Sequence, residues 1–75
     1  MIPLLSAEMY KLVHLAEEGK DVFIRHAKRK STYRVIGYIG VDIDGLWHQY
    51  IQYVDQNSMK VYARHAQNFK NFSKI

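Results

Sequence analysis

The stretch TYRVIGYIGVDIDGLWHQYIQYV, residues 32–54, decides the fold of this chain. Its first half is rich in β-branched and aromatic residues, but Gly37 and Gly40 interrupt it. Two glycines inside a strand pattern predict a bulged or strongly bent strand rather than a flat one. The dipeptide Asp44-Gly45 follows and favours a tight hairpin turn, after which a second aromatic run begins. We therefore expect a bent antiparallel hairpin at the centre of the fold.

A helix is expected before this hairpin, over residues 6–18. Ser6 is a suitable N-cap, and Gly19 can take the left-handed conformation that ends a helix. Leu5 is expected to pack on Tyr10 as a hydrophobic staple. Apolar residues recur at helical spacing and should face the core; they are Met9, Leu12, Val13 and Ala16.

Three further segments complete the pattern. Residues 21–26 alternate with a period of two, which predicts a strand with Val22, Ile24 and His26 on one side. Residues 59–64 also alternate, and we expect Met59, Val61 and Ala63 to point inward and Lys60, Tyr62 and Arg64 outward. Residues 66–72 are expected to form a helical turn or coil whose Phe69 and Phe72 pack on the body.

These elements predict an α+β fold in one domain, residues 1–75, with an N-terminal helix at about 6–18 and a β-rich body at about 21–72. The helix should pack on a small, strongly curled antiparallel sheet of about four strands. An SH3-like barrel is the first choice. An open four-stranded sheet with the helix across one face is the alternative, because nothing in the sequence determines closure.

Composition limits what else the protein can be. The chain has 75 residues and no cysteine, so neither a disulfide nor a thiolate-bound metal can stabilise it. Small domains often gain stability from association, which leaves a homo-oligomer open. The first residues lack the basic segment and apolar run of a signal peptide, and no stretch approaches 18 apolar residues. We expect a cytoplasmic protein with no membrane partner.

Charge is unevenly distributed along the chain. The formal net charge is +4, and by summation residues 1–24 carry −2, 25–34 carry +5, 35–58 carry −3 and 59–75 carry +4. Basic and acidic segments alternate, which indicates a basic patch rather than a uniformly basic surface.

The basic residues are interleaved with tyrosines, and this is the candidate binding site. Cations neutralise phosphates and planar rings stack on bases, so the pattern favours a nucleic acid as the partner. The same charges could hold an acidic protein surface, with Tyr and Arg as anchors, as in a regulator or inhibitor of the nucleic-acid machinery. The predicted binding residues are Arg25, Lys28, Arg29, Lys30, Tyr33, Arg34, Lys60, Tyr62, Arg64 and Lys70.

Other chemistries are disfavoured. The sequence has no nucleophile motif and no phosphate-binding glycine loop, so we expect neither an enzyme nor a cofactor. The segments VFIRHA at 22–27 and VYARHA at 61–66 resemble each other and could bring two Arg-His pairs to one anion. The two imidazoles, at His26 and His65, do not complete a zinc site. Residues 42–45 begin like a calcium loop but lack the later oxygen ligands, so we expect a turn and no metal.

The order of these motifs is similar to that of a small bacterial and phage family known as the domain of unknown function number 1653. The matching segments are RHAK at 25–28, YRVIG at 33–37, YIQY at 50–53 and YAR at 62–64, followed by Phe69. The likeness covers about residues 22–72. It departs from the family at Arg29, where the family has Gly, at Tyr62, where it has Trp, and at His65, where it has Pro; residues 40–45 also replace an acidic and hydroxyl-rich stretch of the family. It implies a compact β-rich domain from a bacterium or phage, and no catalytic residue.

Overall fold

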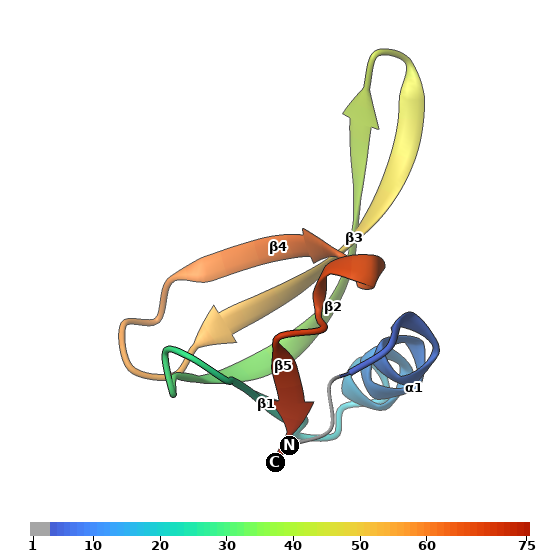
Figure 1. Cartoon of the computed structure of the whole chain (residues 1–75). Coiled ribbons are helices and arrows are strands. Elements are labelled where there is room, and N and C mark those ends of the chain that lie inside the picture. Colours follow the sequence, from blue (N-terminus) through green and yellow to red (C-terminus); the bar gives the residue numbers. More distant parts are fainter. Residues whose placement is uncertain (1–3) are drawn as a thin grey trace.

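The computed structural model describes residues 4–75 (Figure 1). In chain order, its elements are α1 (Ser6–Glu17), β1 (Phe23–His26), β2 (Thr32–Ile43), β3 (Leu46–Asp55), β4 (Val61–His65), the 3-10 helix η1 (Ala66–Asn68) and β5 (Phe72–Lys74). The strands form one antiparallel sheet in the order β4-β3-β2-β1-β5. One helix and a five-stranded antiparallel sheet give the α+β class that the sequence predicts.

The helix ends one residue earlier than expected, at Glu17, and its apolar stripe faces the core as predicted. Met9, Leu12 and Val13 are buried, and Ala16 is partly buried against the core. Gly19 takes the expected left-handed conformation after the helix, with a φ of 91°, and its N–H donates to the Ala16 carbonyl. The start of the helix does not match the prediction. Leu5, rather than Ser6, occupies the N-cap position, and no side chain caps the helix.

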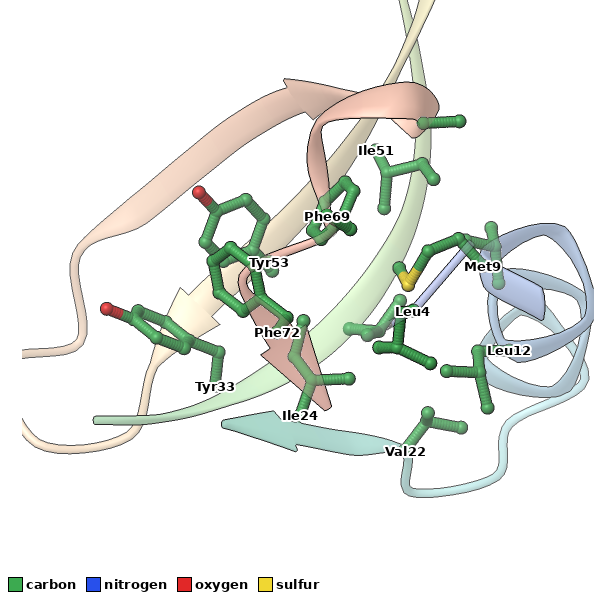
Figure 2. Packing of buried hydrophobic residues seen from close by; sticks show 13 residues of the cluster. Leu4, Met9, Leu12, Val22, Ile24, Tyr33, Ile51, Tyr53, Phe69 and Phe72 are labelled. Carbon is green, nitrogen blue, oxygen red and sulfur yellow. The ribbon is translucent and has the colours of Figure 1, made fainter. Parts of the chain in front are cut away.

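The expected staple is also wrong by one residue. Leu5 and Tyr10 are both exposed, whereas Leu4 and Met9 are buried in one apolar cluster (Figure 2). Because the N-cap lies one residue earlier than expected, the residues at the staple positions move back with it.

The central hairpin follows the sequence prediction closely. The pairing of β2 with β3 shifts between Val35 and Gly37, which is the expected bulge. Asp44 and Gly45 take φ values of 52° and 80°, as the two central residues of a type I′ turn require. The strands continue unbroken to Ile43 and are longer than expected, so the end of this hairpin extends away from the rest of the molecule (Figure 1).

The predicted orientation of residues 59–64 is wrong. Val61 is 57% exposed and Ala63 is exposed, whereas Tyr62 and Arg64 face the core side of the sheet, opposite Tyr53 and Ile51. The alternation predicts which residues share a face of the strand, but not which of the two faces meets the core. That choice is set by the preceding turn, where Met59 has a φ of 63° and lies outside the strand.

The sheet has five strands rather than four, because Phe72–Lys74 form an edge strand paired with β1. This strand is only three residues long and has little pattern of its own. The prediction that Phe69 and Phe72 pack on the body is confirmed, since both are fully buried.

The core lies between α1 and one face of the sheet (Figure 2). At the end near α1 it is aliphatic, and at the other end it is aromatic, where the rings of Tyr33 and Tyr53 lie with their hydroxyl groups directed away from the helix. This aromatic end is where the candidate site begins.

Candidate functional site

A small pocket of about 240 Å³ opens at the aromatic end of the core. Its walls come from the turn after β1 and from β2, β3, β4 and β5, so distant parts of the chain meet there. We call it the aromatic pocket; its lining residues are His26, Arg29, Tyr33, Tyr53, Tyr62, Arg64 and Phe72. Pockets for drug-sized ligands occupy about 300–1,000 Å³, so this one suits a single planar ring or a small anion.

Three tyrosines form one wall of the pocket. The rings of Tyr53 and Tyr62 are stacked, with centroids 5.8 Å apart, and Tyr33 meets both edge-on at 5.2 and 6.3 Å. Tyr33 and Tyr53 are buried, but Tyr62 is 39% exposed. Tyr62 is therefore the ring on which a planar ligand could stack.

Arg64 is held against this wall. Its Nε donates to the Tyr53 hydroxyl at 2.6 Å, Nη1 donates to the Asn68 carbonyl at 3.5 Å, and the guanidinium carbon lies 5.3 Å from the centre of the Phe72 ring. These hydrogen bonds use two of the five guanidinium N–H donors, which leaves others for a ligand. Burial raises the pKa of the Tyr53 hydroxyl although the Arg64 hydrogen bond opposes this, so the phenol is neutral and accepts the bond.

His26 closes the inner side of the pocket and holds the turn that follows β1. It is only 8% exposed, and its Nδ1 accepts the backbone N–H groups of Lys28 and Arg29, both at 3.2 Å. In the neutral ring the proton is then on Nε2, which can donate to a ligand. Burial lowers the pKa of His26, and the positive charges of Arg29, Arg64 and Lys28 lower it further.

No carboxylate lines the aromatic pocket. Within residues 4–75 the ion pairs are Lys20 with Glu18 and Arg34 with Asp21, both at 3.8 Å and both away from the pocket. Arg29 also borders an open polar groove of about 480 Å³, between the turns that follow β1 and β3. The groove is lined by Arg29 and Lys30 but also by the Asp55 carboxylate, and it contains no aromatic ring. The aromatic pocket itself is therefore the part of this surface best suited to an anion that carries a ring.

The structure brings together only part of the predicted binding set. Four of its members, Arg29, Tyr33, Tyr62 and Arg64, line the aromatic pocket. The others are dispersed. Arg25 and Arg34 point out of the opposite sheet face, since their neighbours in the strands face the core; Lys28 and Lys30 are exposed in the turn after β1, Lys60 precedes β4, and Lys70 precedes β5.

Three pocket residues were not in the predicted set: His26, Tyr53 and Phe72. The signal for His26 was present in its strand alternation, which predicts that it faces inward. Tyr53 and Phe72 could be identified as core residues from the sequence. Their place in a site depends on the β3–β4 register and on β5, which the sequence did not specify.

The two Arg-His segments are not equivalent. In β1, His26 faces the core and Arg25 points outward, whereas in β4, Arg64 faces the core and His65 is paired with Tyr50 on the other face. The two Arg-His pairs therefore do not meet as pairs, and the pocket receives one member of each. His65 instead accepts the backbone N–H of Gln67 at 3.4 Å.

Residues 4–75 contain no group of three or more His, Asp or Glu side chains that could hold a metal ion, and their one α-helix is too short and too polar to cross a membrane. In comparisons with known proteins, no family model, no curated protein and no solved structure matches this chain.

Proposed function

We propose that the protein is a small noncatalytic module that binds single-stranded nucleic acid at the aromatic pocket. A base stacks on Tyr62, and Arg29 and Arg64 contact the adjoining phosphates. The basic turn, which we define as Lys28, Arg29 and Lys30, supplies further phosphate contacts.

The observation that carries this proposal is the chemistry of the pocket. Two guanidinium groups and a neutral imidazole lie beside a partly exposed tyrosine, and no carboxylate balances them. Such a site attracts an anion, and the ring adds a contact that every base can use. The small volume favours one unstacked base over a duplex edge, which would need a longer flat surface.

The sheet is open, with β4 and β5 at its two edges. We propose that it nevertheless curls in the manner of an SH3-like barrel, on the grounds of the bulge between Val35 and Gly37 and of the pairing of β5 with β1 after a 3-10 turn. The motif likeness to the domain-of-unknown-function family 1653, which no family-model match accompanies, is our reason to propose a bacterial or phage origin. We propose action in the cytoplasm because the first residues do not resemble a signal peptide. No nucleophile motif accompanies the pocket, which supports a binding role rather than catalysis.

An acidic protein surface is the second candidate partner, as for a regulator of the nucleic-acid machinery. The buried ring cluster favours it, because arginines and tyrosines are frequent anchors of protein interfaces. The two partners differ in salt dependence. Phosphate binding falls steeply with salt, whereas an interface anchored on buried rings depends on it less.

Fluorescence anisotropy with labelled single-stranded DNA, single-stranded RNA and duplex DNA across a salt series tests the proposal. Changing the whole basic turn to serine should weaken binding to every sequence alike. Each lost phosphate contact removes about 0.7–0.9 from the slope of log affinity against log salt, so the slope should flatten by about 2–3. Folding stability should change little, since exposed charges contribute little.

A matched control removes the same charge from other surfaces. The triple serine variant of Lys11, Arg25 and Arg34 takes three cations from α1 and from the opposite sheet face. It should keep affinity and slope closer to those of the parent. An equal loss of affinity in both variants would mean that binding depends on the net charge of the protein and not on this site. Absence of binding by the parent at about 50 mM salt and tens of micromolar protein would contradict the proposal.

A further inference from the structure

The end of the β2–β3 hairpin, residues 39–49, is an isolated two-stranded ribbon, which we call the arm (Figure 1). β1 pairs with β2 only as far as Arg34, and β4 pairs with β3 only from Tyr50 onward. Both long edges of the arm therefore lack a strand neighbour in the described structure. Isolated hairpins are marginal in water, and free edges are common sites of association.

The arm presents apolar side chains at its tip. Trp47 is 76% exposed, the highest value among the large apolar side chains of residues 4–75, and Leu46 beside it is 66% exposed. The indole lies over Gly40, where an added Cβ would be 3.4 Å from the ring, so the ring is oriented although it is open to solvent. An exposed, oriented tryptophan is the residue type most enriched at binding hot spots.

The arm is also the acidic part of the sheet. Asp42 and Asp44 are its charged residues, and residues 39–49 contain no Lys or Arg. Asp42 is the direct cross-strand neighbour of Trp47, so a carboxylate and an indole share one face of the ribbon. The tip thus offers a ring accompanied by negative charge.

These features complement the aromatic pocket, which offers tyrosine rings accompanied by positive charge in a volume of about 240 Å³, enough for one planar ring. We propose that the arm of one copy of this chain docks into the aromatic pocket of a second copy. The indole of Trp47 rests against Tyr62, and the carboxylates of Asp42 and Asp44 face Arg29 and the other cations of the basic turn. Opposite charges at the rim set the orientation, and the rings supply the contact area.

The arm cannot reach the pocket of its own chain. Trp47 and Tyr53 lie six residues apart along the same strand, β3, which is about 20 Å at 3.3 Å per residue. Docking is therefore between copies. Because the arm and the pocket are different surfaces, the contact is heterologous, and repetition gives a ring or an open chain. The docked arm also covers the pocket that the proposed function requires, so assembly and nucleic-acid binding exclude each other.

The chain contains a single tryptophan, so its fluorescence reports directly on the arm. Sedimentation velocity from about 5 µM to about 500 µM, without nucleic acid, should show association, and the emission of Trp47 should shift to shorter wavelength over the same range. Trp47→Ser and the charge reversal of Lys28 and Arg29 to Glu should each weaken association more than about tenfold. A matched reversal of Lys11 and Arg25 to Glu should leave it close to the parent.

Mixing the two weakened variants tests whether the arm of one copy contacts the aromatic pocket of the other. Trp47→Ser keeps an intact pocket, and the Lys28/Arg29 reversal keeps an intact arm, so an equimolar mixture should form a heterodimer that grows no further. A parent that stays monomeric to about 500 µM would overturn the inference. So would a Lys28/Arg29 reversal that associates as well as the parent, since that outcome means arm-to-arm contact.

The inference does not depend on the proposed function. Association without nucleic acid and no binding of oligonucleotides would leave the docking intact and remove the nucleic-acid proposal. If both hold, a single-stranded oligonucleotide should dissociate the parent assembly and return the emission of Trp47 to that of the monomer. An oligonucleotide bound without any dissociation would overturn docking at this pocket.

Discussion

Replacing Arg64 with methionine tests whether the aromatic pocket is held together as described. Methionine keeps an unbranched apolar stem but removes the guanidinium, which bonds the buried Tyr53 hydroxyl and lies over Phe72. The charge-assisted hydrogen bond is worth about 1.5–3 kcal/mol and the cation–π contact about 0.5–1 kcal/mol. Arg64→Met should therefore lower the free energy of unfolding by about 2–4 kcal/mol, a large share of the roughly 4–11 kcal/mol usual for a domain of this size.

Tyr53→Phe separates the contribution of the Arg64–Tyr53 hydrogen bond from that of the contact between Arg64 and the Phe72 ring. It removes the hydroxyl and should cost only about 0.5–1.5 kcal/mol, because the half-buried Arg64 can bond water instead. The double variant leaves no buried hydroxyl without a partner, so its loss should be smaller than the two single losses together by about 1–2 kcal/mol. Urea denaturation measures the free energy of unfolding of all three variants. The comparison requires that their m-values equal that of the parent. A loss below about 0.5 kcal/mol for Arg64→Met, or simple additivity, would refute this account of the pocket.

Three further outcomes follow from the same contacts. Leu12→Ala should cost about 2–4 kcal/mol in denaturant, since the side chain is buried between α1 and the sheet; a change below about 0.5 kcal/mol would mean that the helix does not pack as described. Tyr62→Ala should weaken single-strand binding by about 1–3 kcal/mol and duplex binding less; equal losses by anisotropy would exclude base stacking. Because the folded pKa of His26 is lowered, stability should be full above pH 6.5 and fall as pH drops from 6.5 toward the folded pKa. His26→Asn keeps an acceptor for the turn, so thermal unfolding across pH should lose that dependence; an unchanged profile would mean that His26 is not its source.

Much of the fold could be predicted from the sequence because its signals are local. The apolar stripe of the helix, the left-handed Gly19 and the Asp44-Gly45 turn each depend on neighbouring residues only. The bulge also had a local signal in Gly37. The expected helix cap failed by one residue, which is within the usual uncertainty of a helix start.

The candidate site was harder to predict because it depends on strand phase and on distant contacts. Alternation predicts which residues share a face but not which face meets the core, and the turn at Met59 decides this for β4. A charged residue was expected to point to solvent, yet Arg64 lies on the core side because Tyr53 and Phe72 accommodate its guanidinium. The edge strand containing Phe72 is recognised only once β1 is in place.

The central claim is that nucleic acid binds at the aromatic pocket, and backbone amide shifts of the ¹⁵N-labelled protein test it most directly. Titration with a short single-stranded oligonucleotide at low salt should shift amides in the turn from His26 to Tyr33, at Tyr53, and from Tyr62 to Arg64. Amides of α1, and of residues on the opposite sheet face away from the turn, such as Ile36, should shift least. Shifts centred on that opposite face, or none at saturating oligonucleotide, would contradict the claim.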